Sequence, residues 1–222
     1  MRFVLLNVAA TLVLCAPFAG AQNRGVPNAL ELAAKIDAHY NHLRTLRLNF
    51  SENYRGMGMN RAETGTLQLA KPGKMRWEYS KPSGKLFLLN GQFAYSWAPG
   101  DGQVQKIRSA RLDDLRSPMR LLLGRTKLEK ELSNLAIAPT ETLGVWRLIG
   151  TAPALKDRIQ RITLTAKQDG TLLGIEIVEM DGSETRFEFS NEQDNAAPAP
   201  GAFEFHAPEG VPIIEVKPPR EH

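Results

Sequence analysis

The chain has 222 residues, a formal net charge of +4 and one cysteine. This length is sufficient for a single domain with a sizeable hydrophobic core, and one cysteine leaves no intrachain disulfide to stabilise it. Lysine and arginine are scattered among aspartate and glutamate, so the mild basic charge lacks the massed patch of a nucleic-acid-binding protein, and we expect no nucleic acid partner.

The first 21 residues have the pattern of a secretion signal. A basic residue precedes an apolar run over residues 3–18, and Ala19-Gly20-Ala21 provides the small-x-small triplet that signal peptidase recognises. The run is shorter than the roughly 20 apolar residues of a transmembrane helix. We therefore expect cleavage near Ala21 and an exported, soluble single domain over residues 22–222. The alternative, lipid modification of Cys15, is disfavoured because a large residue precedes this cysteine.

The start of the mature region predicts one helix followed by strands. Asn28 and Glu31 form a capping-box pattern ahead of apolar residues at helical spacing, so we expect a helix over residues 29–44. The period then changes to two. Strands are expected over residues 46–54 and 64–70, with a flexible hairpin loop over residues 55–60.

The segment from Lys71 to Gly91 contains two further strands bounded by Lys-Pro pairs. In the first, Met75, Trp77 and Tyr79 share one face and charged residues occupy the other, as in a sheet that is wet on one side only. Asn90-Gly91 predicts a tight turn, because both residues tolerate positive φ, and a strand over residues 93–97 follows. The apolar face needs a cover, which is either the protein's own core or an apolar ligand.

The middle of the chain interrupts this strand pattern with helices. After a turn and a strand over residues 103–108, the residues from 112 to 132 have helical periodicity. Ser117-Pro118 predicts the start of one helix, and Thr126 with Glu129 predicts the start of a second, shorter helix.

The rest of the chain is predicted to form strands separated by turns. The expected strands cover residues 135–138, 145–150, 161–166, 172–180 and 184–190, then 202–206 and 211–216 after a polar connector over residues 191–201. Roughly ten antiparallel strands favour a single curved sheet that forms an incomplete β-barrel. Its apolar concave face would be covered by the N-terminal helix and the mid-chain helical lid. A β-sandwich is the alternative, but a sandwich needs no amphipathic helix at those two places.

Motifs for catalysis or for cofactor binding are lacking. The sequence has no nucleophile elbow and no phosphate-binding glycine loop. His39 and His42 could share a metal ion, but no HExxH motif or acidic third ligand accompanies them, so a solvated helix face is the better interpretation. Asp113 and Asp114 point apart on a helix and suit its N-terminal dipole. We expect no enzyme, cofactor or metal; a hydrolase would have to depend on His39, His42 or Asp113.

A set of large apolar side chains on consecutive strands is the candidate ligand-binding wall. Any one of them could belong to an ordinary core, so the prediction depends on the whole set, in which methionine adds an adaptable surface. The set comprises Phe50, Leu67, Leu69, Met75, Trp77, Tyr79, Phe87, Tyr95 and Trp97. Met119, Leu122 and Leu123 lie on the helix that would cover them.

Several short motifs occur in an order and spacing typical of one family. They are Lys71-Pro72, Met75-Arg76-Trp77-Glu78-Tyr79, Lys81-Pro82, Asn90-Gly91, Ser117-Pro118 ahead of Leu121-Leu122-Leu123-Gly124, and Phe203-Glu-Phe205 with Pro208-Glu-Gly-Val211. In this succession the sequence resembles the LolA family of periplasmic carriers of outer-membrane lipoproteins. The resemblance extends over about residues 30–216.

The resemblance implies an incomplete antiparallel β-barrel with a helical lid, which holds the acyl chains of a lipoprotein. It also implies a periplasmic protein, expected to be a monomer, that receives acylated lipoproteins from an inner-membrane LolCDE-type transporter and passes them to an outer-membrane LolB-type receptor. A related module of the same fold that senses or carries another lipid or lipoprotein-derived ligand is the alternative.

The resemblance also assigns roles to single residues. Met75 and Trp77 match cavity-wall positions of the family. LolA proteins often have an arginine that holds the closed lid by hydrogen bonds, and the matching residue here is Lys71. Lysine lacks the planar fork of arginine, so Lys71 is expected either to hold the lid more weakly or to be a solvated strand end.

Overall fold

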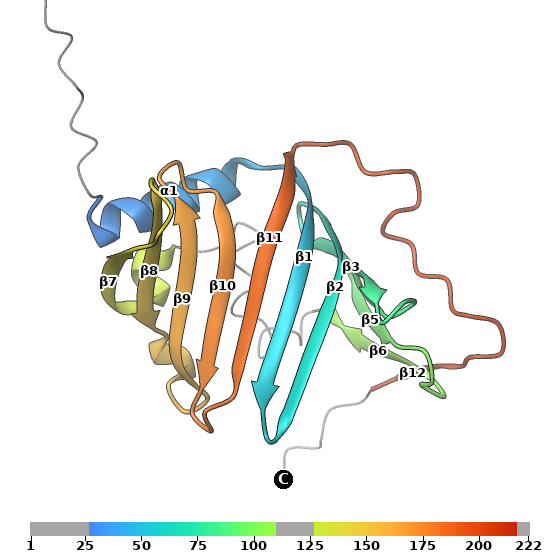
Figure 1. The fold of residues 1–222 in the computed structure, drawn as a ribbon. Coiled ribbons are helices and arrows are strands. Elements are labelled where there is room, and N and C mark those ends of the chain that lie inside the picture. The colour runs from blue at the N-terminus through green and yellow to red at the C-terminus, as the bar shows by residue number, and fades with distance from the viewer. Residues whose placement is uncertain (1–26, 110–126, 217–222) are drawn as a thin grey trace, which may run out of the picture.

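The computed structural model describes residues 27–109 and 127–216, which form one twelve-stranded sheet with two α-helices and one 3₁₀ helix (Figure 1). Neither of these α-helices has the length and apolar character that a membrane crossing requires. The elements are α1 (Ala29–His42), β1 (Thr45–Gly56), β2 (Met59–Ala70), β3 (Lys74–Lys81), β4 (Leu86–Asn90), β5 (Phe93–Trp97), β6 (Val104–Arg108), α3 (Leu128–Glu131), β7 (Ser133–Pro139), β8 (Val145–Thr151), η2 (Pro153–Leu155), β9 (Ile159–Lys167), β10 (Leu172–Glu179), β11 (Glu184–Asp194) and β12 (Ile213–Glu215).

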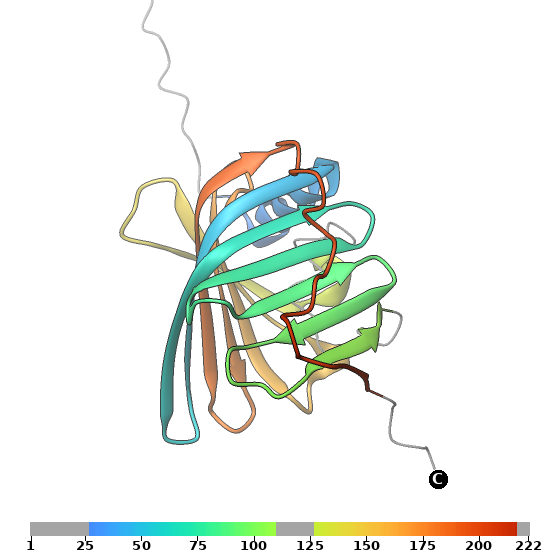
Figure 2. The ribbon, with the colours of Figure 1, turned by 90° about the vertical axis from the view of Figure 1, so that its right-hand side faces the viewer.

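The sheet is a linear series of strands in the order β12-β6-β5-β4-β3-β2-β1-β11-β10-β9-β8-β7. Strands β1–β6 with β12 form an N-terminal half-sheet, β7–β11 form a C-terminal half-sheet, and the antiparallel pair β1 and β11 joins the two. The edge strands β12 and β7 are not neighbours, so the sheet curves without closing (Figure 2). The expectation of one open, curved sheet is confirmed. The described residues form twelve strands, where roughly ten were expected, and all pairs are antiparallel except that β12 runs parallel to β6.

Helix α1 begins where the sequence predicts and ends two residues earlier than expected. The side chain of Asn28 accepts a hydrogen bond from the Glu31 amide at 2.8 Å, which satisfies one of the free N–H groups of the first turn. The apolar face of α1 is almost fully buried at Leu32, Ala33, Ile36 and Tyr40. The short helix α3 packs beside α1, and its Leu128 amide donates to the Asp37 carboxylate at 2.8 Å.

The hairpin between β1 and β2 is tighter than the sequence suggests. Pairing continues to Gly56 opposite Met59, so only Met57 and Gly58 turn the chain, both with positive φ. The predicted flexible loop over residues 55–60 is therefore wrong at both ends. In the predicted turn at Asn90-Gly91, Gly91 has a positive φ of +99°. The Asn90 side chain accepts hydrogen bonds from the backbone amides of Gln92 and Phe93.

The C-terminal region differs most from the sequence prediction. Strand β11 continues to Asp194, through the first part of the predicted connector, and residues 202–206 form no strand. Residues 196–212, here called the C-terminal strap, instead cross the outside of the N-terminal half-sheet as irregular chain before β12 (Figure 2). The five strands predicted between residues 135 and 190 are confirmed, with boundaries shifted by a few residues.

The hydrophobic core lies on one side of the curved sheet. A single cluster of buried side chains combines residues of α1 and α3 with inward-facing residues of both half-sheets. This side is the concave face, around which the sheet bends, and the opposite side is the convex face (Figure 2).

Candidate functional site

The N-terminal half-sheet contributes rows of large apolar side chains to the concave face. Antiparallel register places one residue of each strand beside its partner on the next, so that alternating residues form continuous rows across the sheet. One row consists of Leu46, Leu69, Met75 and Leu89, and the next consists of Leu48, Leu67, Trp77 and Phe87. These side chains are at most 4% exposed, except for the partly buried Phe87.

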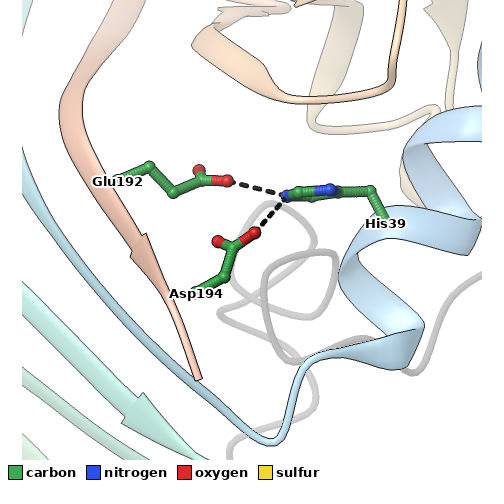
Figure 3. Close-up of side chains that lie close together, drawn as sticks. All are labelled: His39, Glu192 and Asp194. Carbon is green, nitrogen blue, oxygen red and sulfur yellow. Dashed lines mark hydrogen bonds and ion pairs between the residues drawn. The ribbon is translucent and has the colours of Figure 1, made fainter. Parts of the chain in front are cut away.

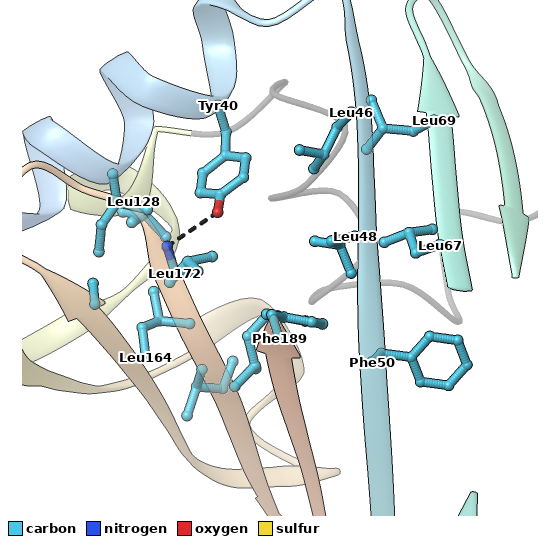
Figure 4. Close-up of a cluster of buried hydrophobic side chains, with 14 of the residues drawn as sticks. Tyr40, Leu46, Leu48, Phe50, Leu67, Leu69, Leu128, Leu164, Leu172 and Phe189 are labelled. Atoms are coloured by element: carbon cyan, nitrogen blue, oxygen red, sulfur yellow. Dashed lines mark hydrogen bonds between the residues drawn. The ribbon is translucent and has the colours of Figure 1, made fainter. Parts of the chain in front are cut away.

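Aromatic rings pack against one another in this wall, in which Phe50 follows Leu46 and Leu48 along β1 (Figure 4). The ring of Phe50 packs edge-on against Trp77 at 4.6 Å and against Tyr79 at 5.1 Å between centroids. Gly65 pairs with Phe50 across β1 and β2, and a Cβ atom at this position would lie 2.9 Å from the Phe50 ring. Glycine therefore leaves the space that the ring fills.

The C-terminal half-sheet provides the other part of the wall. Its row consists of Ile137, Leu148, Leu164, Ile175 and Phe187 on successive strands, and Phe187 lies 5.7 Å from Trp77 between ring centroids. The sequence-based set contained none of these residues. The signal was present in the period-two alternation of residues 184–190, in which Phe187 and Phe189 are two apart.

The structure separates the predicted wall residues into two groups. Phe50, Leu67, Leu69, Met75, Trp77, Tyr79 and Phe87 share the concave face. On β4, Leu88 pairs with Tyr95 and Leu86 pairs with Trp97. The same two leucines pair with Arg76 and Glu78 of β3, which point away from the apolar wall. Both aromatic residues therefore lie on the convex face. The prediction that Tyr95 and Trp97 belong to the same wall is therefore wrong, because Ala94 and Ser96 are the inward residues of β5.

The C-terminal strap explains why aromatic residues lie on the convex face. Phe205 of the strap stacks on Tyr95, with 4.5 Å between centroids and 3° between ring planes. The Arg76 guanidinium also reaches the Ala202 carbonyl at 3.5 Å. Beneath this cover, Leu88 and Val104 have no exposed surface. The convex face of this half-sheet is therefore a second, smaller packed layer.

A polar cluster borders the apolar wall on β1, β2 and β3. The Tyr79 hydroxyl donates to the buried Glu52 carboxylate at 3.2 Å. Glu63, which is also buried, pairs with Lys85 and, at 3.4 Å, with Arg61. Burial and then the neighbouring Glu63 raise the pKa of Glu52 above its ordinary value. Burial also raises the pKa of Tyr79, which keeps this hydroxyl protonated. The concave face thus ends in a cluster of charged and hydroxyl groups.

Tyr40 connects α1 to the C-terminal half-sheet. Its hydroxyl donates to the Glu192 carboxylate at 2.8 Å and accepts from the Leu172 amide at 3.0 Å (Figure 4). Burial, followed by the charge of Glu192, raises the pKa of Tyr40. Close by, a Cβ on Gly170 would clash with the Lys35 carbonyl, so glycine permits the β9–β10 turn to touch the helix backbone. The helix is held over the end of the concave face.

Lys71 also binds this helix. Its ammonium group donates to the Tyr40 carbonyl, one of the last carbonyls of α1 that has no partner within the helix. The residue is partly buried, and this burial lowers the pKa of Lys71. Lys71, which directly follows β2, therefore connects the sheet to α1 and is not a freely solvated strand end. The other predicted lid residues, Met119, Leu122 and Leu123, lie outside the described residues, as do Asp113 and Asp114.

The two histidines of α1 have different surroundings. The Nε2 atom of His39 lies 2.7 Å from Glu192 and 3.9 Å from Asp194, both at the end of β11 (Figure 3). Burial is the main reason that the pKa of Glu192 is raised. His42 is exposed and does not belong to this group. The acidic partners of His39 were missed in the sequence because they are more than 150 residues away.

Comparison with known proteins identifies the family. Residues 41–206 match the family model described as outer membrane lipoprotein carrier protein LolA. This chain belongs to the LolA family. LolA relatives include an outer-membrane lipoprotein carrier protein of Chromobacterium violaceum, 26% identical over 195 residues, with 87% of this chain and 92% of the relative covered. Another, from Cupriavidus necator, is 30% identical over 168 residues, covering 72% and 76%.

A solved structure of low sequence identity has a similar fold. It is an uncharacterised conserved protein from Thermus thermophilus, with a TM-score of 0.54 at 9% identity, and the match covers 85% of this chain and 99% of that chain. The LolA match includes all of β1–β11, so every strand except β12, and with them the rows of the concave wall, lies within the family region.

Proposed function

We propose that this protein is a periplasmic carrier that binds the acyl chains of lipoproteins against its concave face and moves them from the inner to the outer membrane. The observation that supports this most is the continuous apolar wall, which extends through both half-sheets and includes Met75, Trp77 and Phe187. Membership of the LolA family and the names of the relatives support the same proposal.

The energetics of acyl chains make such a wall necessary for transport. Exposing an acyl chain to water costs about 0.8 kcal/mol per methylene, or about 12 kcal/mol for a chain of roughly fifteen carbons. A carrier must therefore replace water with apolar side chains along most of the chain. It must also release its cargo, so the loaded and empty forms have to be close in free energy.

We infer that α1 is a movable cover in this cycle. Its buried side chains belong to the same cluster as the wall, so displacing α1 would expose apolar surface that an acyl chain could cover again. Its sheet contacts at Tyr40 and Lys71 are polar, and water can replace polar contacts at modest net cost. The predicted lid over residues 117–132 would act together with α1.

The route of the cargo is part of the same proposal. Residues 1–21 direct export and are removed near Ala21, leaving a single domain in the periplasm. The carrier then receives lipoproteins from a LolCDE-type transporter and delivers them to a LolB-type receptor.

Mass spectrometry of ligands that co-purify from the periplasm of a native host tests the proposal. Diacylated or triacylated lipoproteins are the expected ligands, and a synthetic lipopeptide should displace them. Recovery of phospholipid alone, with no lipopeptide binding, would favour a module of the LolA fold for another lipid. A chain that binds neither class of acylated molecule would contradict the proposal.

A further inference from the structure

We propose that His39, Glu192 and Asp194 form a binding site for a zinc-like divalent cation that links α1 to β11. This site is separate from the concave apolar wall and does not depend on the carrier function. Among the described residues, these three side chains form a group of potential metal ligands. One donor atom from each side chain lies within 4.8 Å of the donor atoms of the other two.

The donor set fits a zinc-like ion. Imidazole and carboxylate are both common zinc ligands, and catalytic or exchangeable sites use three protein ligands with one position left for water. Ligand atoms about 2.0–2.2 Å from a tetrahedral ion lie about 3.3–3.6 Å apart. The Nε2 atom of His39 is 2.7 Å from Glu192 and 3.9 Å from Asp194, so small side-chain movements would bring these atoms to metal-binding distance (Figure 3).

Charge also favours a cation at this position. Two carboxylate side chains lie beside one imidazole, so acidic groups outnumber basic groups in this cluster. The side chains of His39 and Glu192 are only 18% and 12% exposed, whereas Asp194 is 43% exposed. The site is thus shielded on the protein side and accessible from solvent at Asp194.

Tyr40 positions one of the proposed ligands. Its hydroxyl donates to Oε2 of Glu192 at 2.8 Å, which leaves Oε1 directed at His39. The same hydroxyl is fixed by the Leu172 amide, and the His39 ring packs edge-on against the Tyr40 ring at 4.7 Å. Such outer contacts hold ligands in orientation and raise metal affinity.

A bound cation would join the C-terminal part of α1 to the sheet junction, since β11 pairs with β1. The helix would then be harder to displace. Metal occupancy is therefore expected to slow the opening of α1, a consequence that rests on the proposed function although the site itself does not.

Titration of the exported chain, purified without a histidine tag, with Zn²⁺ against a chromophoric competing chelator tests the proposal. We expect one equivalent bound with a micromolar or tighter Kd. His39→Gln and Asp194→Asn should each weaken binding at least about tenfold, and Tyr40→Phe about tenfold through the outer contact. Asp194 is exposed, so this variant is expected to fold normally.

His42→Gln is the matched control, because His42 is an exposed histidine on the same helix. Binding should be unchanged in this variant, and Co²⁺ should give visible absorption bands in wild type and His42→Gln but not in His39→Gln. Absence of Zn²⁺ binding, or binding that persists in both His39→Gln and Asp194→Asn, would show that the group is a simple histidine–carboxylate ion pair and would overturn the proposal.

Discussion

The two faces of the N-terminal half-sheet are both covered, but by different parts of the chain. On the concave face, Trp77 contacts rings of β1 and β11 and shares a cluster with the helix α1. On the convex face, which Tyr95 and Trp97 share, Phe205 of the C-terminal strap stacks on Tyr95. An aromatic residue on a strand therefore indicates a covered face, and only the register shows which face it is.

This comparison separates residues that should affect ligand binding from residues that should affect stability alone. Side chains of the concave face share a cluster with α1, which in our proposal moves aside for an acyl chain. Side chains of the convex face meet a segment that continues directly into β12 and is fixed by pairing with β6. Substitutions of the same residue type on the two faces are the clearest way to test this difference.

Trp77→Ala should have the largest effect. Removing a buried tryptophan costs about 3–5 kcal/mol in the free energy of unfolding. Lipopeptide affinity should also fall more than tenfold, because the ring lies at the centre of the wall. Urea unfolding and fluorescence titration with a lipopeptide measure the two effects.

Trp97→Ala is the matched control for this variant. It should lower stability, since Trp97 is partly buried, and leave lipopeptide affinity within about twofold of wild type. Equal losses of affinity in the two variants would mean that the faces are not functionally distinct.

Gly65→Ala should have the next largest effect. The new Cβ would clash with the Glu78 carbonyl and lie 2.9 Å from the Phe50 ring, so backbone or ring must move. Overpacking of this kind costs about 1–3 kcal/mol, measurable as a lower denaturation midpoint. Gly102→Ala is the control, because a Cβ at that position meets no atom within 4 Å. Similar midpoints for the two variants would contradict the tight packing of Phe50 on Gly65.

Phe205→Ala tests the convex cover. Loss of the stack with Tyr95 should cost about 1 kcal/mol beyond the loss of buried area, and lipopeptide affinity should not change. Thermal unfolding and the same lipopeptide titration provide the comparison. A loss of affinity here would mean that the strap takes part in ligand binding.

The smallest expected effect is a pH dependence caused by Glu52. Burial and Glu63 raise the pKa of Glu52 in the folded state, while Lys85, Tyr79 and Arg61 oppose this shift. Between its ordinary value of 4.5 and the higher folded pKa, the folded state binds more protons than the unfolded state. Stability contributed by protonated Glu52 is therefore present at low pH and is lost as pH rises through the folded pKa.

Glu52→Gln removes this proton linkage. Relative to wild type, the free energy of unfolding of the variant should increase as pH rises from 4.5 towards neutrality and then level off. Urea unfolding at a series of pH values measures the difference. A difference that is constant with pH would show that Glu52 has the same pKa in both states.

Local sequence patterns predict much of this fold, because they depend on neighbouring residues. Period-two alternation identifies Met75, Trp77 and Tyr79 as sharing a face, and the capping residue Asn28 identifies the start of α1. The open, curved sheet follows from the number of strands and the two amphipathic helical regions.

Contacts between distant segments could not be predicted in this way. Alternation shows that Tyr95 and Trp97 share a face but not whether this face is concave, which depends on the strap about 110 residues later. The partners of His39 likewise come from β11. In residues 202–206 the alternating pattern indicates a strand, yet these residues form no strand and Phe205 packs on Tyr95 by its side chain.

Quenching by a lipopeptide with brominated acyl chains tests the central claim most directly, because the chain has three tryptophans. One variant would keep Trp77 alone, through Trp97→Phe and Trp146→Phe, and the other would keep Trp97 alone, through Trp77→Phe and Trp146→Phe. If acyl chains bind against the concave face, fluorescence will be strongly quenched in the Trp77 variant and unaffected in the Trp97 variant. Equal quenching, or quenching of Trp97 alone, would contradict the account.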